Sequence, residues 1–308
     1  MTATAEGEGM PGDTRAGFVA LIGAPNAGKS TLVNRLVGAK VSIVSRKVQT
    51  TRAPVRGVAI EGQSQIVFVD TPGIFAPKRR LDRAMVRAAW CGAHVADLAV
   101  VLIVASKGIR EDEEAILAAL PDVKTPKWLI LNKVDTIDPP KLLELTAALN
   151  DRAEFAQTFM VSALNGSGCA DLLAALADAM PEGPWFYPED QLSDLPMRML
   201  AAEITREKLY ERLHQELPYA STVETEKWED RKDGSVRIEQ IVYVERDSQK
   251  KIVLGRGGET IKAISMAARA EIAELIGQPV HLFTFVKVRE RWGDDPERYR
   301  EMGLDFHD

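Results

Sequence analysis

The chain has 308 residues, of which 45% are hydrophobic and 27% charged, and its net charge is −6. This length allows two domains with a core each, and no apolar run approaches the roughly 18 residues of a membrane span. The acidic balance excludes a protein that coats nucleic acid over its whole surface, but it is compatible with a local basic groove. Two distant cysteines and four scattered histidines indicate neither a disulfide framework nor a zinc site, and favour a reducing cytoplasm.

Composition also predicts how the chain is divided. Residues 1–15 are rich in Thr, Ala, Glu, Gly and Pro and lack the basic start and apolar core of a signal peptide, so we expect a disordered tail. Four prolines and one glycine between residues 181 and 196 predict an extended linker at 182–195. This linker would separate a first domain, residues 16–181, from a second domain with a C-terminal tail, residues 196–308.

The first motif is the phosphate-loop pattern G-x-x-x-x-G-K-[ST] at residues 23–30. An apolar run at 18–22 predicts a buried strand before it, and leucines at helical spacing predict a helix after it. Glycines let the backbone fold round a polyphosphate, and the helix N-terminus adds positive potential. Lys29 would reach the β- and γ-phosphates, and the Ser30 hydroxyl would coordinate Mg²⁺. We therefore expect a nucleoside triphosphate on Gly23, Ala24, Pro25, Asn26, Ala27, Gly28, Lys29, Ser30 and Thr31.

Two further features predict contacts to a γ-phosphate. Residues 45–52 are polar and have no sustained period, which is typical of a mobile loop that closes on Mg²⁺ through a threonine, here Thr51. A strand predicted at 65–69 ends in Asp70-Thr71-Pro72-Gly73. An acidic residue in that position can hold Mg²⁺ directly or through water. The backbone N–H of Gly73 can meet the γ-phosphate.

The next strands indicate where the base is read. A nearly continuous apolar run at 97–104 predicts a strand buried on both faces of a parallel sheet. Another strand, at 127–131, leads into Asn-Lys-Val-Asp at 132–135, and a last short strand leads into Ser-Ala-Leu at 162–164. The carboxylate of Asp135 can accept two hydrogen bonds from the N1–H and exocyclic amine of guanine, whereas adenine presents a mismatched edge.

These motifs stand in order at strand ends and together resemble the translation-factor branch of GTPases. The resemblance implies an α/β fold with a doubly wound, mostly parallel sheet and GTP at the C-terminal ends of the strands. It implies Mg²⁺ on Ser30 and Thr51, with Asp70 as an outer-shell partner, and catalytic roles for Lys29, Thr51 and Gly73. The resemblance further implies a guanine pocket, in which the Ala163 N–H meets the base carbonyl; its residues are Asn132, Lys133, Asp135, Ser162, Ala163 and Leu164.

The expected catalytic machinery departs from the usual template at one position. Ras-like enzymes place a glutamine after the glycine that corresponds to Gly73, to orient the attacking water, whereas this chain has Ile74. We therefore assign no water-positioning group. In similar GTPases with Pro-Asn in the phosphate loop, the asparagine carbonyl holds K⁺ beside the phosphates. The resemblance thus implies K⁺-stimulated, slow hydrolysis through Asn26; the alternative is that Asn26 only shapes the loop.

The second domain predicts RNA binding. A helix is predicted at 197–213, strands at 221–228 and 236–246, a helix from 261 and a last strand at 279–288. A G-x-x-G loop lies between two helices, and such loops clamp about four nucleotides of single-stranded RNA in KH domains; taken alone, a helix-cap turn explains it equally well. The order of elements resembles a type II KH fold. The candidate RNA-binding residues are Lys250, Lys251, Gly255, Arg256, Gly257, Gly258 and Lys262.

GTPase motifs followed by such a domain resemble the Era family of bacterial ribosome-assembly GTPases over residues 17–300. Segments 49–52, 245–251 and 255–262 match its pattern. The resemblance implies a monomer that binds the small-subunit (16S) rRNA near its 3′ end during subunit assembly, in the cytoplasm, with loose peripheral attachment to the membrane. Two alternatives stay open: a nucleotide-gated RNA scaffold with negligible hydrolysis, and a P-loop ATPase, against which Asp135 argues.

Overall fold

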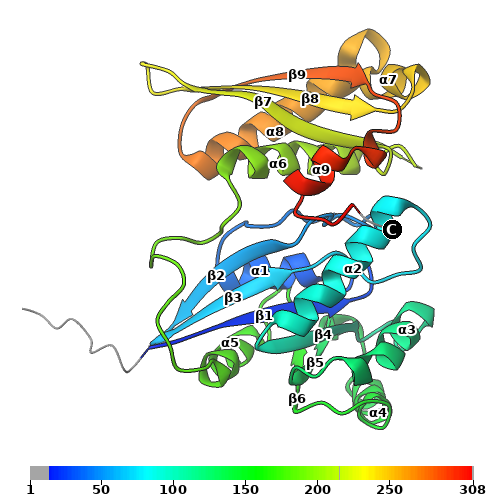
Figure 1. The fold of residues 1–308 in the computed structure, drawn as a ribbon, viewed down its shortest axis with the longest axis vertical. Coiled ribbons are helices and arrows are strands. Elements are labelled where there is room, and N and C mark those ends of the chain that lie inside the picture. Colours follow the sequence, from blue (N-terminus) through cyan, green and yellow to red (C-terminus); the bar gives the residue numbers. More distant parts are fainter. Residues whose placement is uncertain (1–13, 215, 307–308) are drawn as a thin grey trace, which may run out of the picture.

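The computed structural model describes residues 14–214 and 216–306, which form two layered units, one above the other (Figure 1). The first unit is a six-stranded sheet of order β2-β3-β1-β4-β5-β6, in which only β2 is antiparallel to its neighbour. Its elements are β1 (Arg15–Gly23), α1 (Lys29–Val37), β2 (Val55–Glu61), β3 (Ser64–Asp70), α2 (Arg80–Val95), β4 (Leu98–Val104), α3 (Glu111–Ala119), β5 (Lys127–Asn132), α4 (Pro139–Asn150), β6 (Gln157–Val161) and α5 (Cys169–Ala179).

Helices cover both faces of this sheet. Helices α1 and α5 pack on one face, while α2, α3 and α4 pack on the other. Every residue of β4 is buried, as its unbroken apolar run predicts for a central strand. Because β1, β3, β4 and β5 are parallel, their C-terminal ends meet at one edge, where the phosphate-loop, Asp70 and Asn132 motifs follow directly. The predicted doubly wound α/β fold is confirmed.

The second unit is a three-stranded sheet with helices on one face. Strand β7 is antiparallel to β8, and β8 is parallel to β9. The order helix, strand, strand, helix, helix, strand confirms the predicted type II KH fold. Its elements are α6 (Met197–Arg212), β7 (Ser221–Asp230), β8 (Val236–Val244), α7 (Asp247–Leu254), α8 (Glu259–Ile276), β9 (Val280–Val288) and α9 (Pro296–Glu301).

The prediction of a disordered tail at residues 1–15 is wrong for its last two residues. Residues 1–13 lie outside the described part of the chain, but Arg15 begins β1 and pairs with Ser64. The Thr14 hydroxyl donates to the carbonyl of Gly183 at 2.9 Å. These two residues are ordered because the neighbouring strand and the start of the linker satisfy their backbone groups.

Two connections join the units. Residues 41–52, which we call segment 41–52, lie against α6, and the side chain of Ile43 is buried in the core of the second unit. The C-terminal segment reaches α2, where Trp292, just before α9, and Leu304, just after it, share an apolar cluster with Leu81 (Figure 1). The loop expected to move with the nucleotide, at residues 45–52, thus belongs to a segment in contact with the second unit. Within the described residues, no helix has the length and apolar character needed to cross a membrane.

Candidate functional site

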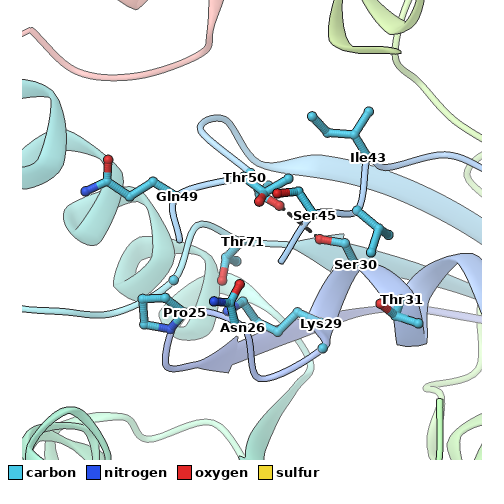
Figure 2. A pocket seen from close by; sticks show the side chains of 14 residues that line it. Pro25, Asn26, Lys29, Ser30, Thr31, Ile43, Ser45, Gln49, Thr50 and Thr71 are labelled. Carbon is cyan, nitrogen blue, oxygen red and sulfur yellow. Dashed lines mark hydrogen bonds between the residues drawn. The ribbon is translucent and has the colours of Figure 1, made fainter. Parts of the chain in front are cut away.

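The phosphate loop surrounds a buried lysine. Lys29, at the start of α1, donates from Nζ to the carbonyls of Gly23 at 3.0 Å and Ala24 at 3.2 Å. Burial lowers the pKa of Lys29 to about 8, and the nearby negative charge of Asp70 opposes this shift. Phosphate oxygens at this position would stabilise the charged ammonium. Figure 2 shows Lys29 with Pro25 and Asn26 on one side of the pocket and Ser45, Gln49 and Thr50 on the other.

Two glycines allow the close approach of backbone segments here. Gly28 has φ +98°, and a Cβ at this position would overlap the amide nitrogen of Asn132. A Cβ on Gly73 would lie 3.0 Å from backbone atoms of Pro25, and the N–H of the next residue, Ile74, donates to the carbonyl of Gly23 at 3.0 Å. The motif at residues 70–73 therefore lies directly on the phosphate loop, as its predicted γ-phosphate contact requires.

The three predicted metal ligands come together. Ser30 Oγ lies 2.9 Å from Thr51 Oγ1 and 2.6 Å from Asp70 Oδ2, and Thr51 Oγ1 lies 3.3 Å from the same oxygen. Neighbouring ligands of octahedral Mg²⁺ are about 2.9 Å apart, because each oxygen is about 2.1 Å from the ion. Asp70 Oδ1 is buried and has no hydrogen-bond partner in the described structure. These oxygens fit Mg²⁺, with Ser30 and Thr51 as ligands and Asp70 beside them.

The environment of Asp70 includes a residue that the sequence did not identify. Burial raises the pKa of Asp70, while hydrogen bonds from Ser30, from Ser42 and then from Thr51, with the charge of Lys29, oppose the shift. Ser42 is buried and donates to Asp70 Oδ2 at 2.7 Å. No local motif marks Ser42, since its partner is 28 residues away.

The predicted base-reading residues, except Ser162, line a cavity of about 850 Å³ that adjoins the phosphate pocket. Asp135, exposed on the short turn after β5, lines its wall, as do the buried Ala163 and the exposed Leu164 after β6. Tyr210 and Glu211, at the end of α6, line the same cavity. The second unit therefore forms part of the wall around the expected nucleotide, which no pattern in the first domain indicates.

Asn132 is a brace between loops. Its Nδ2 donates to the carbonyl of Ala27 at 2.8 Å, and its Oδ1 accepts from the N–H groups of Lys133 at 2.8 Å and Ala163 at 3.1 Å. Lys133, with φ +62°, extends its Nζ to the carbonyl of Asn26 at 2.9 Å. Asn132 and the Ala163 N–H thus hold the phosphate loop and the base pocket together, and their contacts with guanine stay a prediction. Ser162 is buried beneath this brace.

Ile74 does not face the pocket. It is 5% exposed and packs with Ala24, Ala89 and Ala93 in the core between the sheet and α2. A side chain held there cannot orient water at a γ-phosphate. Ile74 therefore serves the packing of α2 on the sheet and does not replace the catalytic glutamine.

The G-x-x-G loop lies between α7 and α8 as predicted. Gly255, Gly257 and Gly258 have φ values of +75°, +59° and +84°, which favour glycine. A Cβ on Gly255 would overlap Thr260, whereas Gly257 and Gly258 face open space. The predicted basic residues Lys251, Arg256 and Lys262 are exposed around this loop, and Lys250 is half-buried on α7.

A groove of about 340 Å³ runs from this loop between α8 and β9. Met266, Phe283 and Phe285 line it although each is more than 40% exposed, and Lys262 and Arg269 add positive charge. Flat apolar side chains beside cations are suited to stacking unpaired bases. No motif marks these apolar residues, but the alternation along β9 carries a signal, since it places Phe283 and Phe285 on one outward face.

Comparisons with known proteins agree with this architecture. A family model described as 50S ribosome-binding GTPase matches residues 18–133, and one described as KH domain matches residues 216–293. The GTPase Era of Rhizobium meliloti (strain 1021) is 73% identical over 95% of this chain and 94% of its own. The GTPase Era of Brucella suis biovar 1 (strain 1330) is 69% identical over 99% and 98%.

Two solved structures superpose on nearly the whole chain. One is Era in complex with MgGDPNP and nucleotides 1506–1542 of 16S ribosomal RNA, and it has a TM-score of 0.89 at 36% identity. The other is a variant of Aquifex aeolicus Era bound to GDP·AlF4⁻, with the same TM-score and identity. Each covers 94% of this chain and 99% of the matched one.

Proposed function

Because the chain belongs to the GTPase Era family, we propose that it binds and hydrolyses GTP with Mg²⁺ and binds 16S rRNA near its 3′ end, assisting assembly of the small ribosomal subunit. The observation that carries the GTPase half is the convergence of Ser30, Thr51 and Asp70 at Mg²⁺ ligand spacing. The basic and aromatic groove next to the G-x-x-G loop supports the RNA half.

The chain's own residues suit this reaction. Lys29 and the Gly73 N–H would bind the β- and γ-phosphate oxygens and stabilise the charge that grows on them as the terminal bond breaks. Mg²⁺, when bound by Ser30 and Thr51, supplies further positive charge to the same oxygens. The position after Gly73, which holds the water-orienting glutamine in Ras-like enzymes, is occupied here by the buried Ile74. We therefore expect slow intrinsic hydrolysis.

Turnover of GTP in Mg²⁺ and K⁺ buffer, against ATP and XTP, tests the GTPase half. Asp135→Asn should weaken GTP binding about 100-fold and favour XTP, because the amide cannot accept both guanine hydrogen bonds. Retained GTP preference would contradict the assignment of Asp135. GTP binding without measurable turnover would instead favour the alternative function, a nucleotide-gated RNA scaffold.

K⁺ dependence is a separate proposal that centres on Asn26. Asn26 has φ +62°, and its Nδ2 donates to the carbonyl of Arg46 at 3.0 Å, so this side chain links the phosphate loop to segment 41–52. Its side-chain carbonyl would hold K⁺ beside the phosphates. Asn26→Ala should abolish the difference between hydrolysis rates in K⁺ and Na⁺. An unchanged K⁺/Na⁺ ratio in this variant would leave Asn26 with the shaping role alone.

Crosslinking to cellular RNA followed by sequencing tests the RNA half. Gly257→Asp places a carboxylate in the open G-x-x-G loop and should remove enrichment of the 16S 3′ end without changing GTP turnover. Gly234→Asp is a matched control, since Gly234 also has positive φ and open surroundings but lies in the β7–β8 turn. Equal enrichment for Gly257→Asp and wild type would reduce the loop to a helix cap.

The remaining predictions concern location and assembly state. Assembly of the small subunit would place the protein in the cytoplasm, with loose attachment to the inner face of the membrane as a further prediction. Flotation of the protein with anionic vesicles tests that attachment. Sedimentation velocity tests the predicted monomer.

A further inference from the structure

Three consecutive residues join the metal site to the RNA-binding unit. Ser42 donates to Asp70 Oδ2 at 2.7 Å. Ile43 is 2% exposed and packs in the core formed by α6, β8 and α8. The N–H of Val44 donates to Glu207 Oε1 on α6 at 2.7 Å. A chain this short cannot move at one end without displacing the other, since consecutive Cα atoms are only about 3.8 Å apart.

Glu207 also belongs to an ion cluster that reaches α8. Its Oε2 accepts from Lys40 at 2.6 Å and from Lys208 at 3.2 Å, and both lysines also pair with Glu271 of α8. The Glu207 side chain is 4% exposed. Burial would raise the pKa of Glu271, but hydrogen bonds from Lys208 and Lys40 lower it overall. Glu207 therefore links segment 41–52 to the helix that begins at the G-x-x-G loop.

The adjacent residue on α6 holds the other end of the segment. Arg206 is buried, pairs with Glu203, and donates from Nη2 to the carbonyl of Thr50 at 2.5 Å. Thr50 directly precedes the metal ligand Thr51. Helix α6 thus holds both ends of the stretch that brings Thr51 to Ser30.

We propose that Glu207 is a positioning residue that couples the two ligands: it holds segment 41–52 closed for Mg²⁺·GTP and, through Lys40 and Lys208, keeps α8 in the RNA-competent position. This inference rests on the proposed function. RNA on α8 and a γ-phosphate on Thr51 then favour the same arrangement of the two units, so each ligand strengthens binding of the other by the same factor.

The test measures this factor directly. The affinity for a fluorescent 3′-terminal 16S RNA fragment is determined with Mg²⁺·GDPNP and with Mg²⁺·GDP, and the ratio of the two is the coupling factor. We expect a factor of about 10 or more for the wild type, within the usual allosteric range. Glu207→Gln keeps an acceptor for Val44 but removes the charge, and Lys40→Met removes the cross-domain lysine; each should lower the factor below about 3.

Controls separate coupling from general damage. The double variant Glu207→Gln/Lys40→Met should have a coupling factor no lower than that of either single variant, because both substitutions break the same ion pair. Glu114→Gln breaks a half-exposed ion pair with Arg152 far from this cluster and should keep the wild-type factor. Thermal melting checks folding, and if Glu207→Gln does not fold, Lys40→Met carries the test alone.

Each outcome decides between the proposals. A wild-type factor in the variants, or a factor near 1 in the wild type itself, overturns the coupling while leaving an RNA-binding GTPase. Absence of RNA or GDPNP binding in every protein, wild type included, overturns the proposed function and the coupling with it.

Discussion

The phosphate loop and segment 41–52 both face the nucleotide pocket, but they are held by different parts of the molecule. The phosphate loop is braced within its own domain, by Asn132 and by the backbone of Ile74. Segment 41–52 depends on α6 of the other unit, through Glu207 and Arg206. Phosphate binding is therefore built into the first domain, whereas placement of the metal ligand Thr51 depends on docking of the second.

This comparison predicts two kinds of variant. Damage to the phosphate loop should weaken GDP and GTP alike, because both carry the phosphates that the loop binds. Damage to the docking of segment 41–52 should weaken only the triphosphate state, because Thr51 is needed there. The ratio of GTP-analogue to GDP affinity distinguishes the two.

Gly28→Ala should have the largest effect. The new Cβ would overlap Asn132, and φ +98° strains any other residue by about 2 kcal/mol. We expect affinity for GDP and GDPNP to fall together by more than about 100-fold, since the brace and the loop are displaced at once. Fluorescent nucleotide titration measures both.

Gly38→Ala is the matched control for this variant. Gly38 also has positive φ, +77°, but nothing lies near its missing Cβ. It should lose about 1 kcal/mol of stability and bind nucleotides normally. Equal loss of binding in both variants would mean that backbone strain, and not contact with Asn132, is responsible.

Arg52→Lys tests the part of the site that the second unit holds in place, segment 41–52. The Arg52 guanidinium is buried and donates to the carbonyl of Ser221 at 2.9 Å, to Tyr210 Oη at 3.1 Å and to the carbonyl of Pro218 at 3.1 Å, with Trp292 stacked 5.3 Å from it. A lysine cannot satisfy these acceptors together. GDPNP affinity should fall about tenfold while GDP affinity changes less than about twofold.

Arg56→Lys is the control, because the ion pair of Arg56 with Asp194 is half-exposed and lies away from the pocket. The affinities of this variant for GDP and for GDPNP should equal those of the wild type. A parallel loss of GDP and GDPNP affinity in Arg52→Lys would show that docking supports the whole pocket, and the distinction between the two regions would then be wrong.

The sequence was most informative where short motifs determine local geometry. Gly28, Lys29 and Asp70 were identified from spacing alone, because glycine loops and strand ends impose their own conformation. The same reasoning identified Gly255 and Gly257, and both have positive φ in the structure. The α/β sheet and the KH fold followed from strand patterns and element order.

The contacts between distant segments were not predictable. Ser42 lies next to Asp70, and Ile43 lies in the core of the other unit, yet neither position carries a local signal. The sequence after residue 292 is mostly polar, but Tyr299 and Leu304 are buried against α2. Their spacing fits neither a helical nor a strand period. Such contacts depend on how the two units dock, which periodicity within one element cannot indicate.

The smallest predicted effect concerns the proton on Lys29 and sharpens the account of the phosphate loop. With a pKa of about 8, Lys29 is partly neutral in the free protein above pH 7.5, and phosphates should restore its charge. Binding then takes up a proton, so affinity falls as pH rises. Measured without Mg²⁺, which would engage Asp70, GDP affinity should be about fourfold weaker at pH 8.5 than at pH 7. Lys29→Met should bind GDP weakly and with an affinity that does not change with pH, whereas Lys133→Met should keep the pH dependence. If the GDP affinity of the wild type does not change with pH, the Lys29 ammonium lies in a more polar environment than its burial indicates.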